Sequence, residues 1–240
     1  MTHMPGFSND LFQGKQVVLT GAAGGIGRAI AAAFAACGAE LVRIDRPEAI
    51  PKQERGWIGR DLADRKSLQD AAARITGPVV ALVNCAGVFR RMPLTDARAE
   101  AEWERTLAIN LTAPFLLTRA LVGQLAGGAI VNITSVRAET SAERASAFTV
   151  SKGGLAALTL ALADELAPLG IRANAVAPGD VDTAMGHTDP DITAKLFART
   201  PLKRMARPEE VAAACVFLAS PLASHVTGAT LRVDGGFLAV

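Results

Sequence analysis

Residues Thr20 to Gly27 read Thr-Gly-Ala-Ala-Gly-Gly-Ile-Gly, and they follow the apolar run Val17-Val18-Leu19. An alanine-rich stretch, 28–37, comes next. A β-branched run, closely spaced glycines and an alanine-rich segment predict a strand, a tight turn and a helix. Glycine lets a phosphate approach the backbone, and the helix behind it presents free N–H groups and the positive end of its dipole. The stretch predicts a pyrophosphate site of a dinucleotide, although a glycine cluster taken alone is equally consistent with a packing turn.

The composition of the whole chain narrows the possibilities. Its 240 residues fit one large α/β domain with a sizeable core. Half of the residues are hydrophobic and the net charge is +2, which does not favour nucleic acid or another polyanion as a partner. The first fifteen residues lack an apolar core, so we expect no signal peptide, no membrane anchor and a cytoplasmic location. Three cysteines without metal or redox spacing predict neither a metal site nor a disulfide.

Apolar runs alternate with helical patterns along the chain. Predicted strands cover 40–44, 57–59, 79–84, 129–134 and 172–177. Predicted helices run from the N-cap Asp64 through Ile75, over 100–125 and over 148–169. This alternation predicts a doubly wound parallel sheet of about seven strands, with helices on both faces, in a single Rossmann-like domain that spans residues 1–240.

Asp45 lies eighteen positions after Gly27, at the end of the predicted second strand. A carboxylate there accepts hydrogen bonds from the adenosine ribose and repels a 2′-phosphate, which favours NAD over NADP. Arg46 complicates this prediction, because a guanidinium suits that phosphate or the adenine face. The alternative is that Asp45 is a solvated turn residue.

Asn110 lies inside the predicted helix 100–125, and Pro114 follows one turn later. Asparagine is a poor residue for a helix interior, and proline removes a backbone donor. We therefore expect a local kink with a bound water.

Together these motifs resemble the classical short-chain dehydrogenase/reductase family over essentially the whole chain. The family's later motifs are present as Asp61, Asn84-Cys85-Ala86-Gly87 in place of Asn-Asn-Ala-Gly, Asn110, Ser135, Lys152, Pro178-Gly179-x-x-x-Thr183 and Val233-Asp234-Gly235-Gly236. The resemblance implies NAD(P)-dependent interconversion of a secondary alcohol and a ketone on a small soluble substrate. It implies cofactor contacts at Thr20, Gly21, Gly25, Ile26, Gly27, Asp45, Arg46, Asp61, Leu62, Asn84, Ala86, Gly87, Lys152, Pro178, Gly179, Val181 and Thr183.

The family's catalytic set is asparagine, serine, tyrosine and lysine. The resemblance places these roles at Asn110, Ser135 and Lys152, but Phe148 occupies the tyrosine position and the sequence contains no tyrosine. Oxidation of an alcohol requires removal of the hydroxyl proton, and the reverse reaction requires its supply. A phenol with a pKa near ~10 does this when a neighbouring ammonium lowers its pKa. Phenylalanine has no titratable atom, so we expect this chain to bind cofactor and to turn over poorly.

Two explanations of Phe148 remain open. Either an active enzyme had its tyrosine replaced, which makes this chain an active-site mutant, or the protein is a naturally non-catalytic NAD(H)-binding or regulatory homologue. Retention of Ser135, Lys152 and Asn110 favours the replacement, because drift is expected to change idle partners too. A 3-oxoacyl-acyl-carrier-protein ketoreductase is a further alternative, but such members of the family usually favour NADP, which Asp45 opposes.

Substrate contacts are expected after Ser135, after Gly87 and in a loop or lid around 184–206, which contains His187. Arg137, or Arg90 and Arg91 after Gly87, near the reacting carbon would suit a carboxylate or phosphate on the substrate. The alternative is a surface arginine paired with Glu139 or Glu143. The compact connection between the second and third strands, with Asp45, loosely resembles dehydrogenases of small cyclic diols and polyols.

Two predicted helical segments, 111–125 and 155–169, are apolar or small nearly all round. Their outer faces are therefore expected to pack against another subunit. In the family these helices form a dimer interface of a tetramer, so the resemblance implies a homotetramer. The alternative is that loops of the same chain cover them.

Overall fold

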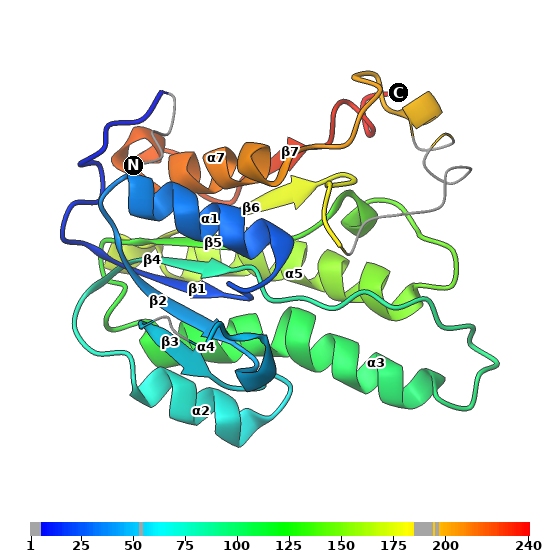
Figure 1. The fold of residues 1–240 in the computed structure, drawn as a ribbon, viewed down its shortest axis with the longest axis horizontal. Coiled ribbons are helices and arrows are strands. Elements are labelled where there is room, and N and C mark those ends of the chain that lie inside the picture. Colours follow the sequence, from blue (N-terminus) through cyan, green and yellow to red (C-terminus); the bar gives the residue numbers. More distant parts are fainter. Residues whose placement is uncertain (1–5, 53–54, 185–193, 195–196) are drawn as a thin grey trace.

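A computed structural model describes residues 6–52, 55–184, 194 and 197–240 of the chain. The described residues form a sheet of seven parallel strands in the order β3-β2-β1-β4-β5-β6-β7 (Figure 1). The strands are β1 (Gln16–Thr20), β2 (Glu40–Asp45), β3 (Trp57–Gly59), β4 (Val79–Asn84), β5 (Ala129–Ile133), β6 (Arg172–Pro178) and β7 (Thr230–Val233). The predicted doubly wound parallel sheet is confirmed.

Helices cover both faces of this sheet. They are α1 (Gly25–Ala36), α2 (Arg65–Ala73), α3 (Ala99–Leu107), α4 (Ala113–Leu121), α5 (Ser146–Glu165) and α7 (Pro208–Ala219). Figure 1 shows α1 and α7 above the sheet and α2, α4 and α5 below it. The two layers bury separate cores, because successive residues of a strand point to opposite faces. In β1, Leu19 packs in the core under α1 and α7, whereas Val18 packs with Leu117 of α4 and Leu162 of α5.

The helix predicted over 100–125 is interrupted. A π-helical turn, Ala108–Thr112, separates α3 from α4 and contains Asn110. Pro114 lies in the first turn of α4, which continues directly from this turn, so its missing N–H leaves a carbonyl of the preceding turn without that helical donor. The α-helix is interrupted at the predicted place, whereas the bound water stays a prediction, and π-helical turns of this kind are frequent at functional sites.

Two other helices have different ends from those predicted. α1 begins at Gly25, three residues before the predicted start, because two of the turn's glycines already belong to the helix. α5 begins at Ser146 and ends at Glu165, and a 3₁₀ turn, Ala167–Leu169, follows it. Asp64 caps α2 as predicted, since its carboxylate accepts a hydrogen bond from the Ser67 N–H at 2.7 Å.

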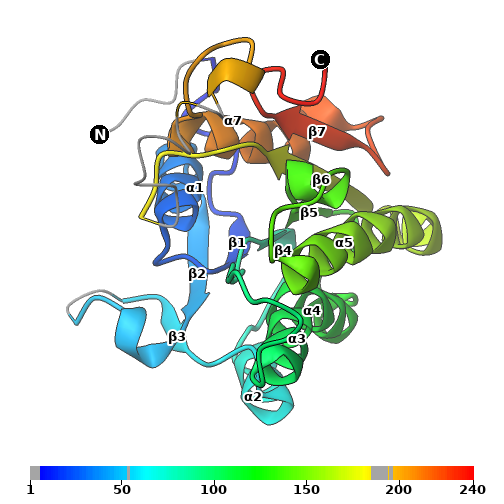
Figure 2. The same ribbon diagram turned by 90° about the vertical axis from the view of Figure 1, so that its right-hand side faces the viewer.

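The carboxyl ends of the strands gather at one edge of the sheet, which faces the viewer in Figure 2. The strand order reverses beside β1, with β2 on one side and β4 on the other. In open α/β sheets ligands bind at such a point, outside the carboxyl ends. Most of the predicted site residues lie in the turns that leave this edge.

Candidate active site

The glycine turn after β1 is folded against the turn after β4. Gly21 has φ +67°, and a Cβ atom on it would lie 2.6 Å from the Ala86 Cα. A Cβ on Gly27 would lie 2.0 Å from the Gly21 carbonyl oxygen. Only glycine fits both positions, because a left-handed φ and these close approaches exclude a side chain.

The N-terminus of α1 is free to bind an anion. Its N-cap is Gly24, no side chain caps it, and its first turn contains no acidic residue. The first N–H groups of a helix have no partner within the helix, and they carry partial positive charge. The donor set therefore fits the pyrophosphate of a dinucleotide, as the sequence predicts.

Two of the predicted cofactor residues have a different role in the structure. The Thr20 hydroxyl is buried and accepts hydrogen bonds from the N–H groups of Cys85 and Ala86, both at 3.1 Å. The buried Asn84 amide donates to Asn132 Oδ1 at 2.8 Å. Both side chains bond within the protein and hold the ends of β1 and β4 in place, and their contact with cofactor stays a prediction.

Asp45 lies where a ribose site requires a carboxylate. Its Oδ2 atom accepts a hydrogen bond from the Ala23 N–H in the glycine turn at 2.9 Å, and its Oδ1 atom accepts one from the Arg46 N–H at 2.8 Å. The half-buried carboxylate is thus attached to the glycine turn, so the alternative of a solvated turn residue is wrong. The Arg46 guanidinium instead pairs with Glu48 at 3.1 Å on the exposed surface.

Asp61 and Leu62, in the turn after β3, lie in different surroundings. Asp61 accepts a hydrogen bond from the Ala63 N–H at 2.9 Å and lies 3.7 Å from a guanidinium nitrogen of Arg105. The Leu62 side chain is buried in the core on the α2 and α4 side. Any contact of Leu62 with an adenine therefore involves its backbone.

The turn after β6 closes the site from the opposite side. A Cβ on Gly25 would lie 2.6 Å from Thr183 Cγ2, so Thr183 lies directly on the glycine turn. Gly179 donates its N–H to the Val233 carbonyl at 3.0 Å, and Val181 forms an isolated parallel bridge with Ala206. Pro178 is the last residue of β6, and the Ile26 side chain packs against the core formed with α1 and α7.

Lys152 is buried beneath this edge, with a relative exposure of 5%. Its Nζ donates a hydrogen bond to the Ile133 carbonyl at the end of β5, at 2.7 Å. A Cβ on Gly87 would lie 3.4 Å from that Nζ and 3.5 Å from Asn110 Oδ1. The structure thus brings the lysine, the asparagine and the turn after β4 together, and burial lowers the pKa of Lys152 to about 8.

Asn110 fixes the segment that follows Gly87. Its Oδ1 accepts from the Val88 N–H at 2.9 Å, and its Nδ2 donates to the Val88 carbonyl at 3.0 Å and to Ser151 Oγ at 3.0 Å. The π-helical turn presents the whole amide group to the loop. Asn110 therefore joins α5 to the wall of the site.

Ser135 follows β5 and is half-buried. Its Oγ accepts the Arg137 N–H at 3.1 Å and caps a 3₁₀ turn, Val136–Ala138. The hydroxyl proton remains able to donate to a substrate oxygen.

Phe148 lies one helical turn before Lys152 on α5, and its ring centroid is 5.8 Å from the Lys152 ammonium. The ring packs edge-to-face against Phe89, with centroids 4.9 Å apart. No motif indicated Phe89, because its contact depends on the path of the loop after β4.

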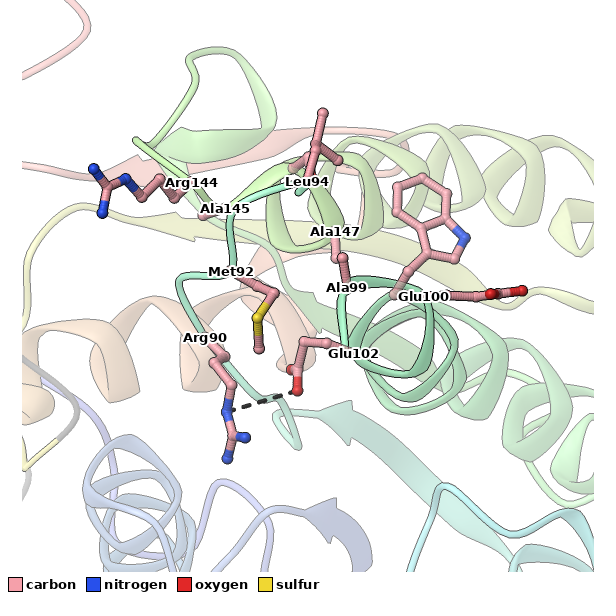
Figure 3. A pocket seen from close by; sticks show the side chains of 11 residues that line it. Arg90, Met92, Leu94, Ala99, Glu100, Glu102, Arg144, Ala145 and Ala147 are labelled. Atoms are coloured by element: carbon pink, nitrogen blue, oxygen red, sulfur yellow. Dashed lines mark ion pairs between the residues drawn. The ribbon is translucent and has the colours of Figure 1, made fainter. Parts of the chain in front are cut away.

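The arginines near the site have other partners than those predicted. Figure 3 shows Arg90 turned toward Glu102, 3.6 Å away, in a pocket of about 300 Å³ between the loop after β4 and the starts of α3 and α5. Arg137 donates to the Ser141 carbonyl at 3.1 Å. The predicted pairing of these arginines with Glu139 or Glu143 is wrong, because Arg232 pairs with Glu139 and Arg144 with Glu143. His187 and much of the predicted lid lie outside the described residues.

Comparisons with known proteins agree with this geometry. A family model described as enoyl-(acyl carrier protein) reductase matches residues 21–238. The chain is 41% identical to galactitol 2-dehydrogenase (L-tagatose-forming) of Cereibacter sphaeroides, covering 93% of this chain and 95% of that one. It is 39% identical to cis-4-hydroxycyclohexanecarboxylate dehydrogenase of Sinomonas cyclohexanicum, covering 96% and 99%.

A solved structure extends the likeness to the whole fold. The structure of a blue fluorescent protein from a metagenomic library, in complex with NADPH, matches with a TM-score of 0.86 at 35% identity, covering 94% of this chain and 98% of that one. The family model and the relatives cover the glycine turn, the strand-end turns and the helix of Lys152 alike. The chain therefore belongs to the classical short-chain dehydrogenase/reductase family of oxidoreductases.

Proposed function

We propose that this protein binds NAD in preference to NADP, holds a small secondary alcohol or ketone beside the nicotinamide, and turns it over slowly because of Phe148. One observation carries the proposal: the ring of Phe148, with no ionisable atom, lies 5.8 Å from the ammonium of Lys152. Asn110, Ser135 and Lys152 supply the other groups that this proposal requires.

Each of these parts has a definite task. A bound nicotinamide supplies the hydride acceptor or donor. Ser135 donates a hydrogen bond to the substrate oxygen, and Lys152 presents a cation beneath it. Asn110 holds the loop after Gly87 against α5, which keeps the cofactor side of the pocket in shape.

The missing task is proton transfer at the substrate oxygen. No phenol lies beside Ser135 and Lys152 to pass this proton between the substrate oxygen and the solvent. A water molecule must therefore take or supply the proton. Loss of a positioned acid–base group costs about 10² to 10⁴ in rate. Slow turnover with intact binding follows.

The preference for NAD rests on Asp45 and Arg46. The Asp45 carboxylate is held beside the glycine turn by the Ala23 N–H, where it would repel a 2′-phosphate. The Arg46 guanidinium, which would attract that phosphate, lies against Glu48. Both observations favour NAD.

The substrate is proposed from the relatives as well as from the site. One relative is named for galactitol and another for a hydroxycyclohexanecarboxylate, and both compounds carry a secondary hydroxyl on a small skeleton. A homotetramer in the cytoplasm is the proposed state of the protein, with the exposed faces of α4 and α5 as contacts.

Phe148→Tyr tests the proposal. With NAD and a panel of small polyols, cyclic alcohols and hydroxy acids, we expect activity to rise about 10²-fold or more over the unchanged chain. Phe89→Tyr is the matched control, because it adds a phenol to the same aromatic pair but not one turn before Lys152. If Phe148→Tyr oxidises no alcohol and its reverse reaction reduces no ketone, the enzyme proposal is wrong.

A second candidate is a naturally non-catalytic sensor of NAD(H), which the complete absence of tyrosine from the chain favours. Tight NADH binding without activity in Phe148→Tyr would identify it. The codon for position 148 in the source gene distinguishes a replaced tyrosine from a natural phenylalanine.

A further inference from the structure

An aromatic side chain and then a cation lie next to Phe148. Phe89 packs on the Phe148 ring, and the Arg91 guanidinium carbon lies 5.8 Å from the centroid of the Phe89 ring. A guanidinium over an aromatic face is held by the ring's quadrupole while its N–H groups stay available in the ring plane. Arg91 thus contacts Phe89, which in turn contacts Phe148 at the proposed position of proton transfer.

Arg137 brings a second cation to the same site. It lies two residues after Ser135, and its backbone N–H donates to the Ser135 hydroxyl. Its half-buried guanidinium is held by the Ser141 carbonyl at 3.1 Å and lies 5.2 Å from the Phe237 ring centroid. Both the backbone and the side chain of Arg137 are therefore fixed relative to the catalytic serine.

Arg199 adds a third cation. Its guanidinium carbon lies 4.7 Å from the centroid of the same Phe237 ring, so two guanidiniums share one aromatic side chain. Burial lowers the pKa of Arg137; the Asp180 carboxylate raises it, whereas the charges of Arg199 and Arg91 lower it further. The charges of Arg91 and Arg199 are thus each close enough to repel that of Arg137.

This cluster contains more cations than anions. Neighbouring arginines are neutralised, since Arg90, Arg144 and Arg232 each pair with a glutamate. In the parts of the chain that the structure describes, neither Arg91 nor Arg199 forms an ion pair with a carboxylate. Like charges held close together are stabilised when an anion binds between them.

We propose that the substrate carries an anionic group, a carboxylate or a phosphate ester, and that Arg137 binds it with help from Arg91 and Arg199. This inference rests on the proposed function, since it names the class of alcohol that the site accepts. Arg137 is the specificity-determining residue, because it alone of the three is attached to the catalytic serine.

The test measures binding rather than turnover, which suits a chain that turns over slowly. Two series of compounds are titrated calorimetrically into the protein saturated with NAD, and each series contains a neutral alcohol, a carboxylate and a phosphate ester. The first series is glucitol, gluconate and glucitol 6-phosphate. The second consists of the corresponding 4-substituted cyclohexanols. We expect an anionic member to bind at least about 10-fold more tightly than its neutral counterpart, because a charge-assisted hydrogen bond is that strong. Comparison of the carboxylate and the phosphate ester identifies the anion.

Variants separate recognition from structure. Arg137→Gln should weaken the preferred anion about 10- to 100-fold and leave the neutral alcohol and NAD unchanged. Arg119→Gln is the control. It removes one exposed positive charge from the surface of α4, at a position that belongs to none of the segments that form the arginine cluster. Equal binding of neutral and anionic members, or equal losses for both in Arg137→Gln, overturns the inference while NAD binding still supports the proposed function. Failure of the unchanged protein to bind NAD overturns both.

Discussion

Asn110 shows how a single side chain shapes this site. The amide satisfies both backbone groups of Val88 and also reaches Ser151, and it is fully buried. Asn110→Ala leaves the Val88 N–H and carbonyl without these partners, so we expect a loss of about 1 to 3 kcal/mol in the free energy of unfolding. Urea denaturation measures this loss. Thr112→Ala, in the same π-helical turn, should change stability far less; equal effects of the two variants would show that the turn, and not the amide, matters.

Lys152 gives the stability of the protein a distinctive pH dependence. Burial lowers its pKa from 10.5 to about 8. Below pH 8 both the folded and the unfolded chain hold the proton, so the cost of burying the charge is fully present. Between pH 8 and 10.5 only the unfolded chain holds it, so this group makes stability increase with pH.

The comparison with Lys152→Met isolates that contribution. The free energy of unfolding of the unchanged protein minus that of the variant should rise on the order of 2 to 3 kcal/mol between pH 7 and pH 10. Urea titrations at intervals of pH supply the two curves, and other ionisable groups largely cancel in the difference. Parallel curves would mean that Lys152 keeps its ordinary pKa in the folded state.

At the scale of the elements, the strands were predictable and the contacts between loops were not. β3 and β4 have the predicted bounds, and in β4 the reason is that an apolar run covered on both faces leaves a strong pattern. The start of α1 was predicted late, because glycine is a poor helix former and yet Gly25 and Gly27 are helical there. Phe89 and Arg199 were missed as site residues, because only the three-dimensional course of separate loops brings Phe89 to Phe148 and Arg199 to Phe237.

The same division applies to the site. The glycine turn, Asp45 and Lys152 follow from local spacing on elements whose geometry is fixed, and the structure brings them to one edge of the sheet. Thr20 and Asn84 occupy positions of the family's motifs, and their polar side chains form hydrogen bonds within the protein. Sequence spacing locates a side chain, whereas hydrogen-bond competition among neighbours decides what it binds.

α4 and α5 are the helices at which the proposed assembly can be tested. Leu160 on α5 is 59% exposed and Phe115 on α4 is 46% exposed. Among the described residues, α5 is the one helix that is long and apolar enough to cross a membrane. In this fold, however, its side with Leu155 and Leu162 is buried in the protein. Exposed apolar side chains on the outer faces of both helices are what the proposed contact between subunits requires.

We therefore expect Phe115→Lys with Leu160→Lys to reduce the oligomer to smaller species. Light scattering after size-exclusion chromatography measures the mass of the particle before and after the change. Leu94→Lys and Leu222→Lys, which add charge at exposed positions of loops, serve as the matched pair and should leave the mass unchanged. A monomeric unchanged protein would contradict the proposed interface.

At the scale of the molecule, the cofactor site is a junction of distant segments. Turns after β1, β2, β4 and β6 meet there, and α5 supplies Lys152 from the layer below. A ligand that contacts all of them binds only the folded chain, so it must stabilise the whole fold.

NADH at 100 times its dissociation constant should add about 2.7 kcal/mol of stability and raise Tm by roughly 5 to 10 °C for a chain of this size. NADPH at the same concentration should raise Tm less, because the Asp45 carboxylate meets its 2′-phosphate while Arg46 is held by Glu48. Differential scanning fluorimetry compares the two. Asp45→Ser should reduce the difference between the Tm shifts with NADH and NADPH, because it removes the carboxylate that repels the 2′-phosphate. Glu48→Gln should also reduce this difference, because it frees Arg46 to bind that phosphate. If NADPH stabilises the unchanged protein as strongly as NADH, the carboxylate does not select the cofactor, and the protein uses the phosphorylated dinucleotide as readily.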